Sequence, residues 1–299
     1  MFLSNFYEGA NITAFCVIGG IFAYKANVLN IALEGMMLMG AFSSALFIMI
    51  TGNIFLGIII SIIITLLLGL IFAVFSISLK SNFIITGLGI NLFVTAISAF
   101  LLQYLGIANI NVSQTVDVLS LKLNIPFIQD IPILGPILSG HSYLTYFSFV
   151  CIILASILMF KTKFGTYVRV VGENEEAAKS VGIKSNKIKY IAVLIGALLC
   201  ALAGANLSVE SLALYTHNMT AGRGFIAIAA IYCGRGMPLK SSIYAIVFGL
   251  TTALADSLSL QINAAGLFKM VPYLMIVVVL AVVSAIESRK TKLRGFKAE

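Results

Sequence analysis

Residues 54–79 read IFLGIIISIIITLLLGLIFAVFSISL, a stretch of 26 residues without a charged side chain. At 1.5 Å per helical residue, this stretch is long enough to cross about 30 Å of hydrocarbon. It is one of nine apolar runs, which lie at about 10–28, 31–51, 54–79, 83–105, 142–160, 190–210, 223–236, 241–258 and 267–286. The sequence therefore predicts an all-α, polytopic helical membrane protein of about nine transmembrane spans, within a range of eight to ten, that forms a single domain over residues 1–299.

The composition agrees with a membrane protein. The chain is 60% hydrophobic and 10% charged, with a mean hydropathy of +1.07, whereas soluble domains are about 45–50% apolar and about 25% charged. These values exclude an ordinary soluble domain, a disordered chain and a secreted disulfide scaffold. The net charge of +8 does not require a nucleic-acid partner, because seven of the nineteen basic residues lie at 161–189 and five at 289–297. Basic segments beside apolar spans are typical of cytoplasmic loops.

The basic segments also predict an orientation in the cell membrane. The 161–189 loop and the 287–299 tail are expected in the cytoplasm. Counting spans from them places the N-terminus and the 106–141 loop outside. That outer loop contains three of the five prolines (Pro126, Pro132 and Pro136). It either folds over the outer face and contacts a partner or is a passive connector.

The chain offers little for catalysis or cofactor binding. Its four cysteines are far apart in apolar runs, and its two histidines lack metal-ligand spacing. It contains neither a G-x-x-x-x-G-K-[ST] phosphate loop nor an H-E-x-x-H motif. The N-terminus lacks the basic region of a cleavable signal peptide, so the first apolar run is expected to remain as a span. We therefore expect no enzyme activity, no metal and no cofactor.

Two of the runs are irregular. The apolar part of the second, 36–50, is only 15 residues, so a full crossing must include Asn30–Glu34 and draws a carboxylate into the bilayer. The seventh, 222–234, is short and begins and ends with glycine. Short, glycine-interrupted segments in both halves of a chain point to broken helices around a central substrate site. We therefore expect broken or short helices near 30–50 and 222–235.

Ionisable and amide side chains inside spans are candidate pathway residues. Asn30 would lie one turn before Glu34 on the same helical face, and the alternative is that Glu34 pairs with Lys25 or Arg235. Asn91 either lines the pathway or bonds across helices. Near the outer surface, Arg223 either contacts substrate or forms an ion pair, and Phe225 either stacks on a planar base or packs against its surroundings. The candidate pathway residues are Asn30, Glu34, Asn91, Asn218, Arg223 and Phe225. The candidate outer-face partner contacts, which are also candidate ion-pair partners of Arg223, are Glu210 and Asp256.

The segment 172–184, GENEEAAKSVGIK, predicts a short, well-capped helix. Its three glutamates would occupy the first turn, Lys179 the last turn, and a glycine the C-terminal stop. Two consecutive alanines would leave one side without bulk, which suits the groove of a partner protein, although a solvated connector helix is the alternative. The candidate docking residues are Glu173, Glu175, Glu176, Ala177, Ala178 and Gly182.

Four stretches, in order, resemble one family. The pattern Glu176-Ala177-Ala178-x3-Gly182 is similar to the start of the EAA loop in permease subunits of ABC importers. NVLNIALEGMMLMGAF at 27–42, NFIITGLGIN at 82–91 and NMTAGRGFIAIAA at 218–230 resemble the branch that serves nucleosides, simple sugars and branched-chain amino acids. The resemblance covers about 20–285 and is greatest to the shorter permease of nucleoside importers. The Leu-Pro that ends the fuller EAA pattern is absent here.

The resemblance implies a permease subunit that forms the translocation pathway for nucleosides, with simple sugars such as ribose or branched-chain amino acids as alternatives. It implies three protein partners: a cytoplasmic ABC ATPase seated on the docking helix, a second permease subunit, either related or identical, and an extracellular or lipid-anchored substrate-binding protein. The residues alone leave an ion-coupled secondary transporter open as well, since broken spans and a membrane carboxylate suit that class.

Overall fold

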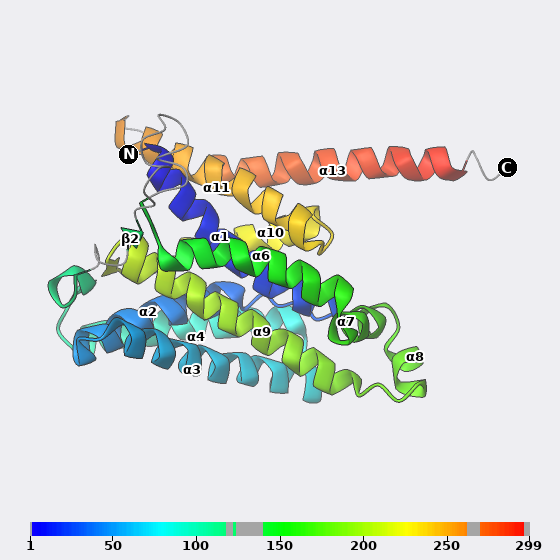
Figure 1. The fold of residues 1–299 in the computed structure, drawn as a ribbon, viewed down its shortest axis with the longest axis horizontal. Coiled ribbons are helices and arrows are strands. Elements are labelled where there is room, and N and C mark those ends of the chain that lie inside the picture. The colour runs from blue at the N-terminus through cyan, green and yellow to red at the C-terminus, as the bar shows by residue number, and fades with distance from the viewer. Residues whose placement is uncertain (1, 118–121, 124–139, 262–269, 296–299) are drawn as a thin grey trace.

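The computed structural model describes residues 2–117, 122–123, 140–261 and 270–295, and these residues form a helical bundle (Figure 1). The long helices of the first half are α1 (Phe2–Lys25), α2 (Leu33–Thr51), α3 (Ile54–Ala73), α4 (Phe83–Tyr104) and α6 (Tyr143–Lys161). The helices that follow are α7 (Lys163–Glu173), α8 (Glu175–Ser180), α9 (Ser185–Ala205), α10 (Arg223–Cys233), α11 (Pro238–Gln261) and α13 (Val271–Gly295).

The remaining regular elements are short. The strand β1 (Ile110–Asn111) pairs antiparallel with β4 (Leu214–Tyr215), and β2 (Lys122–Leu123) pairs with β3 (His141–Ser142). A 3-10 turn, η2 (Val112–Gln114), follows β1. Two π-helical turns, η1 (Val74–Ser78) and η4 (Asn206–Ser211), extend α3 and α9. Because the strands are confined to connections, the expected all-α class is confirmed.

Six helices are long and apolar enough to cross a membrane. They are the segments Leu33–Thr51, Ile54–Ser78, Phe83–Tyr104, Tyr143–Lys161, Ser185–Ser211 and Pro238–Ala255. Three shorter apolar helices, Asn11–Lys25, Arg223–Cys233 and Val271–Val283, complete the set within the described residues. Each expected apolar run therefore corresponds to a helix. The short helix expected near 222–235 is confirmed: α10 has 11 residues, about 16 Å of helix, and cannot cross the bilayer by itself.

The helices α2 and α9 lie at the centre of the bundle. About three quarters of each hydrophobic window is buried, 72% in α2 and 78% in α9, against 28% in α4 and in α6. Small residues allow α2 and α9 to approach closely: a methyl group on Gly40 would lie 2.7 Å from the Cα of Ala201, and one on Gly204 would lie 2.2 Å from the carbonyl oxygen of Met37. Close contacts through small residues are typical of membrane helices.

The outer helices present apolar side chains to the surroundings. On α3 and α4 the side chains of Phe55, Ile85 and Leu92 are 75%, 71% and 72% exposed. A soluble monomer rarely displays apolar surface on this scale. These outer faces are therefore suited to contact with lipid hydrocarbon.

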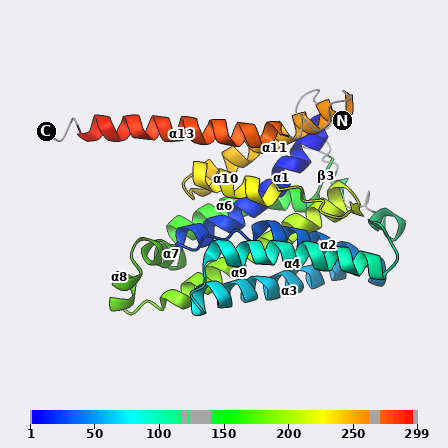
Figure 2. The same ribbon diagram turned by 180° about the vertical axis from the view of Figure 1, so that it is seen from behind.

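The two ends of the bundle differ. Figures 1 and 2 show α7 and α8 at the end opposite the N-terminus, on the same side as the end of α13. The paired strands lie at the N-terminal end. This arrangement agrees with loop 161–189 and the C-terminal segment sharing one side of a membrane. Two parts of the 106–141 loop, 118–121 and 124–139, lie outside the described residues, and they include its three prolines. The last tail residues, 296–299, lie outside them as well.

Candidate functional site

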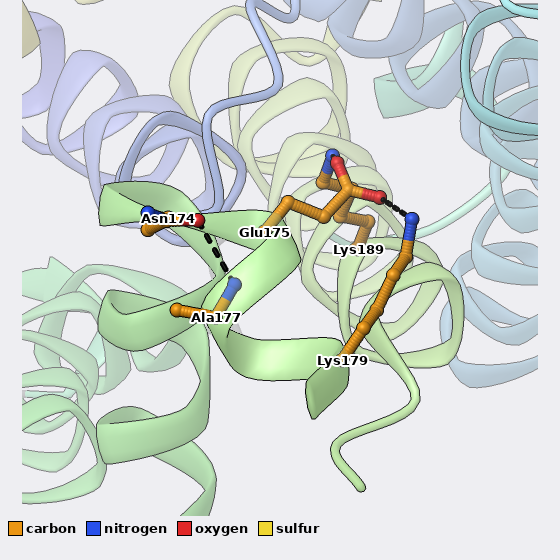
Figure 3. Close-up of polar contacts among 5 residues, drawn as sticks. All are labelled: Asn174, Glu175, Ala177, Lys179 and Lys189. Atoms are coloured by element: carbon orange, nitrogen blue, oxygen red, sulfur yellow. Dashed lines mark hydrogen bonds and ion pairs between the residues drawn. The ribbon is translucent and has the colours of Figure 1, made fainter. Parts of the chain in front are cut away.

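The predicted docking helix is present as α8, a six-residue helix that directly follows α7. The Oδ1 atom of Asn174 accepts a hydrogen bond from the backbone N–H of Ala177 at 2.9 Å and caps its start (Figure 3). Gly182 follows its end with φ = 82°, and the N–H of Gly182 donates to the carbonyl of Lys179 while that of Ile183 donates to Ala178. This pair of bonds is a left-handed C-terminal cap. The expected helix and its stop at Gly182 are confirmed.

Two details of the expected helix are wrong. Glu173 is the last residue of α7, so the first turn of α8 contains only Glu175 and Glu176. Ala178 is fully buried against the bundle, whereas Ala177 is exposed. Consecutive helical residues point about 100° apart, so the two alanines cannot form one face. The outward surface of α8 instead includes Glu176, Ala177, Lys179 and Ser180 and, just after the helix, Val181, which is 73% exposed.

An ion-paired carboxylate joins α8 to the centre of the bundle. Glu175 accepts from Lys179 at 2.7 Å and from Lys189 at 2.5 Å (Figure 3). Hydrogen bonds from Lys179, which has the larger effect, and from Lys189 lower the pKa of Glu175 from 4.5 to about 2. Lys179 belongs to α8 itself, but Lys189 lies in the first turns of α9. This ion pair therefore links α8 to the start of the central helix α9.

A charged hollow lies beside α8. It encloses about 600 Å³ between α8, the start of α9 and the connection from η1 to α4. The charged side chains that line it are Glu175, Glu176, Lys179, Lys189 and Lys80. On the same side, the hydroxyl groups of Ser78 and Tyr190 lie 2.5 Å apart and join η1 to α9. This end of the bundle thus combines an exposed helix with a hollow that is lined by side chains of both charges.

The second candidate region is the carboxylate of Glu34, the second residue of α2. It is buried, and it accepts hydrogen bonds from the hydroxyl of Thr220 at 2.6 Å and from the backbone N–H groups of Gly222 and Gly224 at 2.9 and 2.6 Å. Because α10 begins at Arg223, Glu34 caps the N-terminus of another helix. Its partners are a hydroxyl and two amides, in place of the basic side chain that the ion-pair alternative required.

Two glycines make this contact possible. Gly222 has φ = 83°, a left-handed conformation that other residues adopt at a cost. A methyl group on Gly224 would lie 2.5 Å from the Cα of Glu34, so only glycine allows the two backbones to approach this closely. Gly222 and Gly224, at the start of the short seventh run, are therefore explained by a helix start packed on the start of α2.

The two amide residues near Glu34 also bond to backbone. Asn91 in α4 donates from Nδ2 to the carbonyl of Ile31 at 3.0 Å, and its Oδ1 accepts from the N–H of Gly35 at 2.8 Å. Asn30 precedes α2, and its Oδ1 accepts from the N–H of Ala32 at 3.0 Å. The expectation that Asn30 and Glu34 share a helical face is wrong, because the helix begins only at Leu33.

The remaining pathway candidates lie at or just before the start of α10. Asn218 is exposed with φ = 55°, Arg223 donates from Nη1 to the carbonyl of Met219 at 3.1 Å, and Phe225 is 41% exposed. Beside them is a hollow of about 250 Å³ whose lining includes Arg223 and Tyr273. The structure thus brings Arg223 and Phe225 together with the Glu34 contact.

The outer-face candidates lie elsewhere. Glu210 is buried within η4, where it accepts from the side chains of Asn206 at 2.9 Å and of Ser142. This carboxylate joins α9 to the start of α6. Asp256 belongs to α11, but its side chain lies outside the described residues. Within those residues, no group of three or more His, Cys, Asp or Glu side chains could hold a metal.

Sequence reasoning missed two important partners. Thr220 and Lys189 bond to Glu34 and Glu175 across 186 and 14 residues, respectively. For the contact between Thr220 and Glu34, the only sequence signal was the presence of Gly222 and Gly224 at the start of the short seventh run. A lysine in a basic loop gives no comparable signal, because six other basic residues lie in the same segment.

Similarity to known proteins supports a transport role. The family described as "Branched-chain amino acid transport system / permease component" matches residues 2–280. The nucleoside ABC transporter permease protein NupC of Lactococcus lactis subsp. cremoris (strain MG1363) is 31% identical over 279 residues, which is 89% of this chain and 87% of that protein. The guanosine ABC transporter permease protein NupQ of Bacillus subtilis (strain 168) is 33% identical over 266 residues, or 85% and 80% of the two chains.

A solved structure shares the fold. An ABC transporter described as of the metal-chelate type, in an inward-facing conformation, has a TM-score of 0.54 and 17% identity, covering 94% of this chain and 84% of that one. At this identity the likeness establishes the arrangement of helices alone. The family match over residues 2–280 and the two relatives above establish the family of this chain. The chain belongs to the branched-chain amino acid transport system permease family, and is thus a multi-pass, non-catalytic membrane subunit of an ABC importer.

Proposed function

We propose that this chain forms part of the translocation pathway of an ATP-driven nucleoside importer in the cell membrane. The observation that carries the proposal is the geometry of α8, which is exposed, capped at both ends and joined through Glu175 and Lys189 to the central helix α9. A secondary transporter coupled to an ion gradient does not need a docking helix for an ATPase. The nucleoside assignment is supported by the relatives NupC and NupQ, whose names specify a nucleoside and guanosine.

The proposed topology has nine crossing segments, with the N-terminus outside and the C-terminus in the cytoplasm. In this topology α10 and the non-helical residues 216–222 before it together make one crossing, since α10 alone is too short. The end of the bundle that contains α7 and α8 then faces the cytoplasm, in agreement with its seven basic residues. The described parts of the 106–141 loop face outward.

We further propose how the partners are arranged. A cytoplasmic ABC ATPase docks on α8 and the adjoining charged hollow, with Glu175, Glu176, Ala177, Ala178 and Gly182 forming or shaping the contact. Glu173, at the end of α7, borders that contact. A second permease subunit, related or identical, completes the pathway. A binding protein delivers substrate to the outer face, near the η4 turn that contains Glu210 and near Asp256.

The proposed pathway begins where side chains are accessible beside the start of α10. Arg223 and Phe225 offer a hydrogen-bond donor and an aromatic ring, and a nucleoside offers hydroxyl groups and a planar base. Asn218 lies exposed just before them. The groups at Asn30, Glu34 and Asn91 bond to backbone, so in this proposal they shape the pathway and hold its wall.

The test of the substrate is uptake by proteoliposomes that contain the complete importer, with ATP enclosed and the binding protein outside. Radiolabelled guanosine should accumulate only when ATP is enclosed, and a protonophore should leave the uptake unchanged. Excess unlabelled nucleoside should compete, whereas ribose and leucine should not. Competition by ribose or leucine alone would overturn the nucleoside assignment, and accumulation without ATP would overturn the ATP-driven mechanism.

The test of docking uses a charge reversal. Glu176→Lys places the wrong charge on the outward surface of α8, so uptake and ATPase stimulation by the binding protein should fall at least tenfold while the chain stays inserted. The control is Lys163→Glu, a reversal at the exposed start of α7. Equal uptake by both variants and by the unaltered chain would show that α8 is not the docking helix.

A further inference from the structure

We propose that Glu34 is a positioning residue for transport: its carboxylate fixes the start of α10 and, with it, the side chains of Arg223 and Phe225. The inference rests on the proposed function, because it assigns a role to Glu34 within the proposed pathway. It differs from a direct substrate contact, since the carboxylate is buried and its hydrogen bonds come from the protein itself.

The start of α10 needs an external cap. The first N–H groups of a helix lack partners within the helix, and a side chain at the N-cap position usually accepts a bond from one of them. The N-cap residue of α10 is Gly222, which has no side chain to do so. The two oxygen atoms of Glu34 take over this role for the N–H groups of Gly222 and Gly224.

The segment before α10 also needs external support. Asn218 and Ala221 have φ values of 55° and 46°, and non-glycine residues in this left-handed region store strain that the surroundings must offset. The hydroxyl of Thr220, which lies between them, donates to Glu34 at 2.6 Å. One carboxylate thus holds both the strained segment and the first turn of the helix.

The anchor of this contact lies on two other helices. Glu34 belongs to the first turn of α2, and Asn91 of α4 fixes that turn through the backbone of Ile31 and Gly35. The position of α10 is therefore set relative to α2 and α4. Arg223 and Phe225 flank Gly224, so any displacement of this amide moves both side chains. A carboxylate is required, because both of its oxygens accept and neither donates, whereas glutamine would turn an NH₂ group towards an N–H donor.

The experiment compares Glu34→Gln with Glu34→Asp in the complete importer. Uptake of labelled guanosine gives KM and Vmax per assembled complex. In parallel, chains with the reporter substitution Phe225→Cys are labelled with a maleimide, whose rate reports the position of residue 225, since the four native cysteines are buried. The matched control is Ser44→Ala, which removes another buried polar contact of α2, the bond of 2.9 Å to Ser208 in η4.

We expect Glu34→Gln to lower Vmax at least tenfold and to change the labelling rate of the Phe225→Cys reporter at least threefold. Glu34→Asp keeps the carboxylate and should retain more uptake than Glu34→Gln. Ser44→Ala should stay within twofold of the unaltered chain in both measurements. If Glu34→Gln does not assemble, Thr220→Val removes one donor and keeps the carboxylate, and it should shift the labelling rate in the same sense by a smaller factor.

Two outcomes would overturn the inference. In one, Glu34→Gln, or Thr220→Val in its place, transports and labels like the unaltered chain. In the other, the variant lowers only the amount of assembled complex, with uptake per complex unchanged, which would make Glu34 a residue of stability alone. Failure of the proposed function has a different signature, since the unaltered importer would then show no ATP-dependent uptake of guanosine.

Discussion

Two helix starts in this protein are stabilised by carboxylates, and they do it in different ways. At α10 the carboxylate is Glu34, which comes from a different helix, is buried, and bonds to backbone and hydroxyl groups. At α8 the carboxylates are Glu175 and Glu176, which lie in the helix's own first turn at the surface. Asn174 provides the backbone cap there, and Glu175 pairs with lysines.

Carboxylates are favoured at helix N-termini, and this protein uses that preference in a buried contact at α10 and in an exposed one at α8. A buried carboxylate whose bonds are removed leaves unsatisfied groups in a medium that cannot replace them, so a change there is costly. An exposed ion pair is screened by water and contributes about 0–1 kcal/mol. We therefore expect the start of α10 to be a fixed part of the pathway wall. We expect α8 to be a docking helix whose local stability can change without disturbing the rest of the bundle.

The largest effect is expected from Gly224→Ala. The new methyl group would lie 2.5 Å from the Cα of Glu34, which is backbone and cannot rotate away. Overpacking of this kind costs typically about 1–3 kcal/mol, and here it also displaces the N–H that Glu34 caps. We expect a melting temperature several degrees lower and a loss of uptake of at least tenfold.

Gly89→Ala is the matched control, because a methyl group there would meet no atom within 4 Å and alanine favours helix over glycine. Melting curves of the purified importer and uptake assays measure both variants. If Gly224→Ala were as well tolerated as Gly89→Ala, the start of α10 would not be the rigid member of the comparison.

An intermediate effect is expected from Gly182→Val at the end of α8. No other atom lies within 4 Å of the new Cβ position, but the φ of 82° is unfavourable for a β-branched residue. A left-handed conformation costs roughly 1–2 kcal/mol for residues other than glycine. The C-terminal cap of α8 should therefore weaken, and uptake should fall about threefold to tenfold while the melting temperature of the bundle changes little.

Gly182→Asn tests the cause of that effect, since asparagine tolerates the left-handed region better than valine does. It should retain most of the uptake. Equal loss in the two variants would mean that side-chain bulk, rather than the backbone of α8, disturbs the contact with the ATPase.

The contrast between the two regions also explains what the sequence could predict. The presence of α8 and its end follow from signals within a dozen residues, namely glutamates in its first turn and Gly182 after it. The number and places of the apolar helices follow from the long uncharged runs in the same local way. Local signals were misleading where they depend on the boundary of a helix, as for Glu173, which ends α7, and for Asn30, which precedes α2.

The Glu34 contact could not be derived in this way. Its donors lie 186 to 190 residues further along the chain, and nothing in the composition of either segment specifies the pairing. The glycines of the seventh run predicted a short or broken helix there but gave no indication of its partner. Long-range contacts of this kind depend on how α2, α4 and α10 pack together, which periodicity and spacing do not determine.

The smallest effect is expected from Lys189→Met, which removes one of the two lysines paired with Glu175. The pKa of Glu175 is lowered from 4.5 to about 2, so this carboxylate stabilises the folded chain above about pH 4.5, and the contribution is lost as the pH falls towards 2. Because the pair is partly exposed, its contribution should be below about 1 kcal/mol. Lys189→Met should raise the pKa of Glu175 towards its usual value. It should also lower the melting temperature slightly at neutral pH and make the melting temperature fall less steeply as the pH is lowered.

Lys187→Met, which alters an exposed lysine in the first turn of α9, should leave the fall of the melting temperature in acid unchanged. A larger loss of stability from Lys189→Met than from Gly224→Ala would reverse the comparison, because the tie between α8 and α9 would then be the rigid element and the start of α10 the adaptable one.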